Sequence, residues 1–159
     1  MTRRILGTFV LAAFCVFNVQ TSAQQYAQRE PITLPADAKA IFLAQMLGHV
    51  VGLDDVVTAL GESNYKAAAE IASTELGTPR FQDTEGQAPD QGPGLGVGQY
   101  LPQKFRAISW RFRKAANEFA ELASGMPNSP SAEQQQAAIA ALSKITNQCR
   151  ICHDSYRIE

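Results

Sequence analysis

The chain has 159 residues, of which 45% are hydrophobic and 18% charged, the size and composition of one globular domain with a buried core. Its formal net charge of −1 argues against nucleic acid as the main partner, because nucleic-acid-binding domains carry a strong basic excess. Two separate domains would each be left with a small core.

The first residues have the pattern of an export signal. A basic start is followed by an apolar run from Ile5 to Val19 and by small residues up to Ala23. The run of about 15 residues is shorter than the roughly 20 that a bilayer span needs. We therefore expect residues 1–23 to be removed on export to the periplasm, and residues 24–159 to form a domain that does not span the membrane.

Removal of this segment leaves Cys149 and Cys152 as the two cysteines, because Cys15 leaves with the signal. Thiols of exported proteins enter an oxidising compartment. The pair is therefore expected to form a disulfide, a metal site or a covalent cofactor site.

Two helices are predicted in the first half of the mature chain, after a polar, flexible lead-in over residues 24–35. Residues 36–60 form the first helix, and residues 64–76, rich in alanine, the second. One apolar stripe is expected on the first helix, made of Phe42, Met46, His49, Val50, Leu53, Val56, Val57 and Leu60.

Residues 77–100 are rich in glycine and proline, so we expect a long loop with no regular element. Within it, "GPGLGVG" resembles a phosphate-binding loop only superficially. No strand precedes it and no Lys-Ser or Lys-Thr pair follows.

A third helix is predicted from Pro102 to Ser124 and a fourth from Ala132 to about Tyr156, with Ser129 or Ser131 and Glu133 as its start signal. The expected core positions are Phe105, Ile108, Phe112, Phe119 and Leu122 on the third helix and Ile139, Leu142, Ile145 and Cys149 on the fourth. No segment alternates like a strand. Four helices joined mostly by short loops predict an all-α fold, an antiparallel four-helix bundle.

The third helix also carries a basic run and an aromatic set. Its cations form either a solvated face or a docking patch for an acidic partner. They are Lys104, Arg106, Arg111, Arg113 and Lys114. We expect Trp110, Phe81 and the phenylalanines of the third helix to be core residues and pocket walls.

Cys149, Cys152 and His153 form Cys-x-x-Cys-His, the signature of covalent c-type haem attachment. On a helix, residues three apart lie close to one face, so both sulfurs reach one porphyrin edge, and the histidine ligates the iron. A redox-active pair would open a helix rather than end one. A zinc site would need His49 as a fourth ligand.

Four helices that end in "CRICHDSYR" resemble the class II c-type cytochromes, the cytochrome c′ group and its low-spin soluble relatives. The resemblance implies one haem c bound through Cys149 and Cys152, with His153 as the proximal iron ligand. Arg157 corresponds to the arginine beside the proximal face. The resemblance also allows a homodimer that forms through the first helices.

The sixth iron position decides the function, and the resemblance assigns it to the first helix. Met46 corresponds to the methionine of low-spin members, and His49 lies one turn away. His/Met ligation suits electron transfer to an unidentified redox partner.

The alternative functions are those of an open, five-coordinate iron that binds nitric oxide or carbon monoxide, and of a haem-free helical binding module. No catalytic constellation is apparent, so we expect a non-enzyme.

Overall fold

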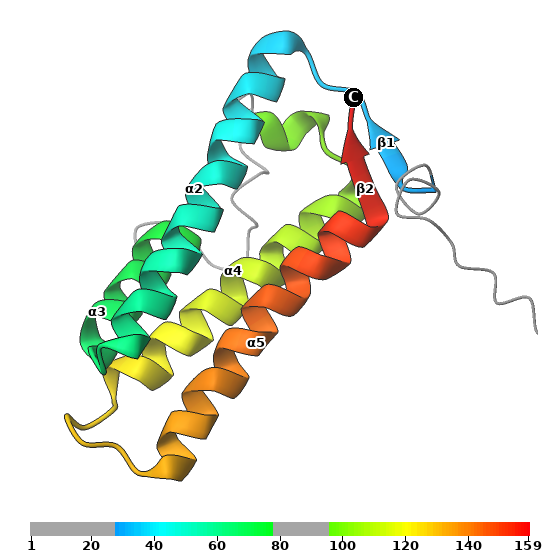
Figure 1. Ribbon diagram of the computed structural model, residues 1–159. Coiled ribbons are helices and arrows are strands. Elements are labelled where there is room, and N and C mark those ends of the chain that lie inside the picture. The colour runs from blue at the N-terminus through cyan, green and yellow to red at the C-terminus, as the bar shows by residue number, and fades with distance from the viewer. Residues whose placement is uncertain (1–27, 78–95) are drawn as a thin grey trace, which may run out of the picture.

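The computed structural model describes residues 28–77 and 96–159, and these are mostly helical (Figure 1), which confirms the predicted all-α class. The helices are α2 (Ala36–Gly61), α3 (Tyr65–Ile71), the π-helix η1 (Ala72–Leu76), the 3₁₀-helix η4 (Val97–Tyr100), α4 (Gln103–Ser124) and α5 (Ala132–Ser155). The predicted signal 1–23 and residues 78–95 of the predicted loop lie outside the described residues. The short helix η4 corrects the expectation that no regular element would occur in 77–100.

Side-chain caps start two of these helices. The Asn64 side chain accepts a hydrogen bond from the Ala67 amide at 3.1 Å. At α5, the Ser131 hydroxyl accepts from the Gln134 amide at 3.3 Å, and the Gln134 side chain accepts from the Ser131 amide at 2.8 Å. This capping box is worth about 1 kcal/mol. Gln134, and not the predicted Glu133, completes it.

Two short strands correct the sequence prediction. β1 (Glu30–Ile32) lies in the lead-in that we expected to be flexible, and β2 (Tyr156–Ile158) follows α5, which ends at Ser155. They pair in parallel, and the amide of Glu159 extends the pairing to the carbonyl of Ile32 at 3.0 Å. Three-residue strands are too short to show alternation, so tertiary contacts and not local pattern create this pair.

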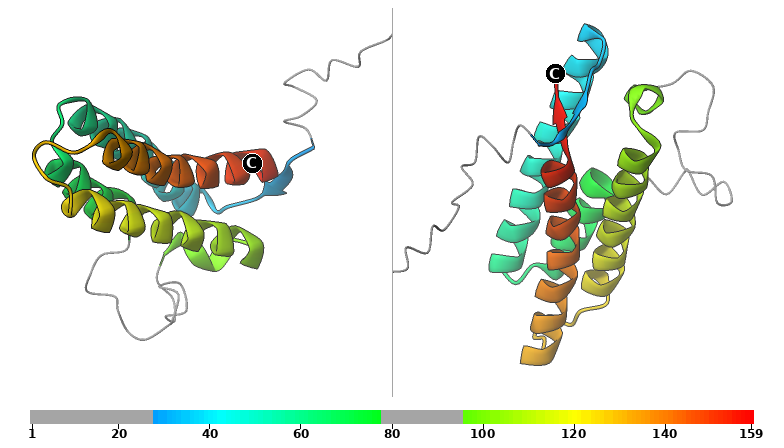
Figure 2. Two further views of the ribbon diagram at one scale, coloured as in Figure 1. Left: turned by 90° about the horizontal axis from the view of Figure 1, so that it is seen from below. Right: turned by 90° about the vertical axis from the view of Figure 1, so that its right-hand side faces the viewer.

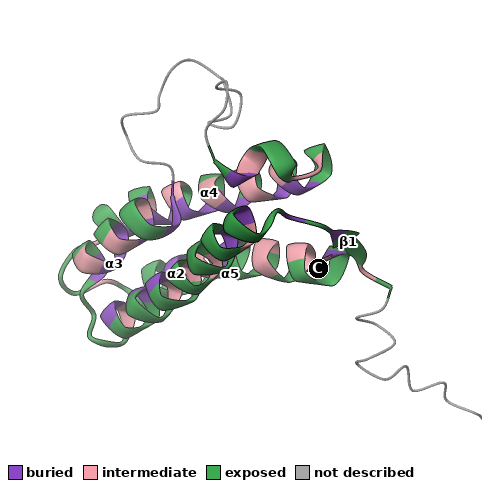
Figure 3. Ribbon diagram, turned by 90° about the horizontal axis from the view of Figure 1, so that it is seen from above, coloured by how far each residue is buried: buried purple, intermediate pink, exposed green. Residues whose placement is uncertain are grey.

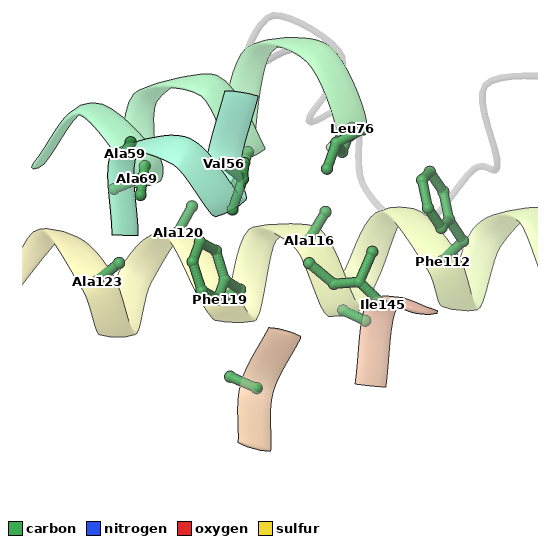
Figure 4. Packing of buried hydrophobic residues seen from close by; sticks show 14 residues of the cluster. Val56, Ala59, Ala69, Leu76, Phe112, Ala116, Phe119, Ala120, Ala123 and Ile145 are labelled. Carbon is green, nitrogen blue, oxygen red and sulfur yellow. The ribbon is translucent and has the colours of Figure 1, made fainter. Parts of the chain in front are cut away.

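Helix α4 carries the longest buried stripe of the fold. It packs along α5 on one side and against α3 and η1 on the other. Phe119 and Ala116 at its centre are fully buried (Figure 4). Burial of a phenylalanine side chain contributes about 1.5–3 kcal/mol. The core positions predicted for this helix are confirmed, with Leu122 partly buried.

The buried residues form two apolar clusters. The large core cluster joins α2, α3, η1, α4 and α5. It contains Val56, Ala59, Ala68, Ala69, Ala72, Leu76, Phe112, Ala115, Ala116, Phe119, Ala120, Ala123, Ala141 and Ile145. The end cluster joins both strands to α2, η4 and α4. It contains Ile32, Leu34, Ala38, Phe42, Val97, Phe105, Ile108 and Tyr156.

Helix α2 is apolar on more than one side. It packs mainly against α3, η1 and η4 rather than against α4 or α5. In the right-hand view of Figure 2, α2 and α4 lie apart. Phe42 and Val56 of the predicted stripe are buried, but Val50 and Val57 are 64% and 50% exposed, which corrects the single stripe. Much of its length is open to solvent (Figure 3).

Among the described helices, α2 alone is long and apolar enough to cross a membrane, with a mean hydropathy of 1.5 over its most apolar window. Length and hydropathy do not separate such a span from a core helix.

Two residues of α4 and α5 that were predicted to be in the core are exposed: Trp110 at 43% and Ile139 at 56%. Each lies on the outer side of its helix.

We predict that Gly52→Ala destabilises the fold by about 1–3 kcal/mol, because overpacking strains a close contact. A Cβ at Gly52 would lie 2.9 Å from Cβ of Glu75 and 3.2 Å from Cδ2 of Leu76. Gly48→Ala, one turn earlier, is the control, since a Cβ there meets nothing within 4 Å. It should stabilise the helix by about 0.5–1 kcal/mol. Chemical unfolding followed by circular dichroism measures both, and equal effects would contradict the contact.

Candidate functional site

The candidate site lies on the last two turns of α5. Cys149 packs against the large core cluster and Cys152 against the end cluster, so the two half-buried thiols lie where the clusters meet. Both are free thiols. His153 follows on the exposed side of the same turn. The structure thus presents both sulfurs to apolar surroundings and leaves the imidazole in solvent.

Burial suppresses the ionisation of both thiols. It raises the pKa of Cys149. For Cys152, burial and then the charge of the neighbouring Cys149 raise the pKa to about 11. A redox-active dithiol needs a low thiol pKa, because the thiolate is the nucleophile. This pair therefore lacks the electrostatics of a thiol–disulfide catalyst.

The strand pair and an aromatic chain hold the end of α5 in place. The ring of Tyr156, directly after α5, contacts Phe105 edge-on at a centroid distance of 5.3 Å, and Phe105 lies 5.8 Å from Phe42. Burial, followed by the charges of Glu30 and Cys152, raises the pKa of Tyr156. The chain Phe42–Phe105–Tyr156 thus connects α2, α4 and β2 beside the second cysteine.

The role of Tyr156 was not predicted from the sequence. The available signal was a pair of apolar residues, Ile32 and Leu34, in an otherwise polar lead-in, beside a proline of the kind that an edge strand tolerates. Both side chains are buried in the end cluster together with Tyr156. A strand in the lead-in needs a partner strand, and the apolar residues Tyr156 and Ile158, which follow His153, could supply one.

Met46 lies on the same apolar cluster as Cys152. It is half-buried and packs against the end cluster, although it is about a hundred residues from the cysteine in sequence. The structure therefore places the first-helix methionine and the second cysteine of the motif against one apolar cluster.

His49 lies one turn further along α2, beside the large core cluster. Its ring is half-buried and its centroid is 4.9 Å from that of Phe112. Burial, followed by the positive charge of Arg113, lowers the pKa of His49 below its usual value. Its surroundings therefore favour the neutral form of the imidazole, which packs on α4.

Arg157 lies in β2 and takes part in the pairing of the chain ends. Its guanidinium forms a 2.9 Å ion pair with Glu159 and donates a hydrogen bond to the carbonyl of Arg29. The side chain is 21% exposed. The role beside a haem that the resemblance implies for Arg157 stays a prediction.

The side chains of Cys149, Cys152 and His153 can be compared with the requirements of a haem and of a zinc ion. Two thiols one turn apart at an apolar junction, with a histidine next to them, fit covalent attachment of a haem edge. The zinc alternative needs His49 near the motif. In the described parts of the chain, no three or more His, Cys, Asp or Glu side chains gather into a metal-binding group.

Comparison of the chain with protein-family models, curated proteins and solved structures finds no match. The assignment of function therefore depends on the residues of this chain.

We predict that the folded, haem-free chain reacts slowly with iodoacetamide. A pKa of about 11 at Cys152, against an ordinary 9.0, leaves roughly a hundredfold less thiolate at pH 8, since each pKa unit is a factor of ten. Alkylation of Cys152 should be at least ten times slower in the folded chain than in the same chain unfolded in guanidinium, as followed by mass spectrometry. Tryptic cleavage after Arg150 puts Cys149 and Cys152 on separate peptides, so the alkylation of each thiol is measured in the unaltered chain. Equal rates would contradict the burial of Cys152.

Proposed function

We propose that this chain is an exported monohaem c-type cytochrome that carries electrons in the periplasm. Cys149 and Cys152 bind haem c through thioether bonds, and His153 and Met46 are the axial iron ligands. Iron held by histidine and methionine exchanges single electrons between its ferric and ferrous states. The proposed role is binding and electron transfer rather than catalysis.

One observation carries this proposal. The Cys-x-x-Cys-His motif lies on the continuous helix α5, and its Cys152 packs against the same apolar cluster as Met46 of α2. A buried, apolar environment controls solvent access to a haem and tunes its potential. Phe42, Phe105 and Tyr156 supply such an environment on the Met46 side of the motif. The suppressed ionisation of the thiols is consistent with cysteines that serve as attachment points rather than redox catalysts.

Met46 is a better candidate than His49 for the sixth position. Met46 shares the end cluster with Cys152, whereas the imidazole of His49 packs on Phe112 of α4. A thioether on a flexible side chain adapts to such an apolar site without a hydrogen-bond partner. His49 then serves as a neutral, aromatic-packed wall of the site.

We further propose that the helices form an antiparallel four-helix bundle whose first helix covers the haem. The packing of α4 along α5, and of α2 on α3 and η1, supports this arrangement. A second copy covers the rest of α2 in a homodimer, which the exposed Leu43, Leu47 and Val50 support. A monomeric mass in analytical ultracentrifugation of the haem-loaded protein would exclude the dimer.

Mass spectrometry of the protein exported by a host that attaches haem tests the proposal. The mature chain should begin at residue 24 and carry the mass of one haem. The double variant Cys149→Ser/Cys152→Ser should carry none, because no thioether bond can form. A wild-type chain without the added mass would leave a haem-free helical module as the remaining function.

The axial ligand is tested by Met46→Ala. We expect the variant to lose the weak far-red sulfur-to-iron absorption of the oxidised protein and to become high-spin, while Met126→Ala, in the turn after α4, leaves the spectrum unchanged. A wild-type protein that is already high-spin and binds nitric oxide or carbon monoxide would favour the five-coordinate, gas-binding alternative. Met46 would then be a packing residue.

A further inference from the structure

The outer side of α4 presents an exposed tryptophan among cations. Trp110 is 43% exposed and is the one large hydrophobic side chain of α4 that is exposed to this degree. Residues three and four apart are neighbours on a helix surface. The neighbours of Trp110 at these spacings include Arg106, Arg113 and Lys114. We call these four residues the basic-aromatic face.

The positive charge of this face is poorly balanced. Residues 103–114 of α4 contain five cations and no carboxylate, in a chain whose formal net charge is −1. Lys114 lies 3.8 Å from Glu118, but both side chains are largely exposed, so this pair contributes little. Arg106 and Arg113 are half-buried, and neither forms an ion pair with another described residue. Two positioned guanidiniums are therefore available to a partner.

Arginine and tryptophan are among the residue types enriched at the energetic centres of protein interfaces. A guanidinium binds a carboxylate with two parallel hydrogen bonds, and a positive face steers an acidic partner into place. A membrane surface fits less well, because binding in its plane needs a continuous apolar stripe, and Trp110 is the single large apolar residue exposed on this helix. The chemistry of the face selects an acidic protein.

The face backs directly onto the candidate site. The inward side chains of the same turns of α4 are Phe105, Ile108 and Phe112, all buried, and Phe112 contacts His49. The charge of Arg113 reaches far enough to influence His49. A protein docked here would be separated from the site by one helix.

We propose that Arg106, Trp110, Arg113 and Lys114 form the docking face for an acidic redox protein, with Trp110 as its apolar anchor. This inference depends on the proposed electron-carrier function. It adds the chemistry of the partner and the side of the molecule through which electrons pass.

The test uses the haem-loaded protein and a dye-labelled ten-residue peptide of eight glutamates and two phenylalanines at low salt. We expect Arg106→Gln/Arg113→Gln to weaken binding of this peptide, measured by fluorescence anisotropy, at least fivefold. The matched control Lys39→Gln/Lys66→Gln removes the same charge from α2 and α3 and should change binding less than twofold. Trp110→Ala, which changes no charge, should weaken it at least threefold.

Electron passage is tested by oxidation of the reduced protein with hexacyanoferrate(III), which takes one electron from the ferrous haem and becomes hexacyanoferrate(II). The rate should fall severalfold in the arginine double variant and remain within twofold in the lysine control. The exposed Lys114→Glu replaces the double variant in both measurements if circular dichroism shows that the half-buried arginines are needed for folding.

Equal effects of the two double variants would overturn the proposal, because they would report net charge alone. Unchanged binding by Trp110→Ala would overturn the anchor. Binding to phosphatidylglycerol vesicles that is lost in the arginine double variant would assign the face to a membrane instead. Peptide binding does not require haem, so a chain that binds the peptide but lacks the mass of haem would contradict the proposed function and not the face.

Discussion

The buried stripe of α4 is the constraint on which the rest of the structure depends. Phe119 and Ala116 at its centre are fully buried, and α3, η1 and α5 all pack against this helix. At its start, Phe105 connects it to Phe42 of α2 and to Tyr156 after α5. Loss of this stripe would remove the surface on which α3, η1 and α5 pack, and apolar burial is the dominant favourable contribution to folding.

The position of the candidate site follows from this packing. The clusters on α4 meet beside the end of α5, so Cys149 borders one and Cys152 the other. The parallel pairing of β1 with β2 then holds the segment after His153 against the lead-in of the chain. A motif on the last turns of a helix would fray in isolation, and here the strand pair and Tyr156 prevent it. The same contacts fix which side of Cys152 meets apolar side chains.

Helix α2 has more apolar surface than the chain itself covers. Large side chains on it are half or more exposed, among them Leu47 at 65% and Val50 at 64%. Contiguous apolar exposure of this kind marks binding surfaces. We propose that haem on the Met46 side and a second copy on the other cover α2, while the basic-aromatic face of α4 stays free for an acidic partner. The two helices would then divide cofactor binding, assembly and docking between them.

The sequence by itself determined the helices, because the spacing of Phe105, Ile108, Phe112 and Phe119 leaves one way to bury them. Its Cys149, Cys152 and His153 motif predicts haem attachment. The sequence could not show that Trp110 and Ile139 face solvent, since burial depends on where neighbouring helices lie. It also missed the strand pair, in which β1 (Glu30–Ile32) lies beside β2 (Tyr156–Ile158). Only the tertiary structure decided that Met46 and Cys152 pack against one cluster, because contacts between distant segments arise from packing and not from local pattern.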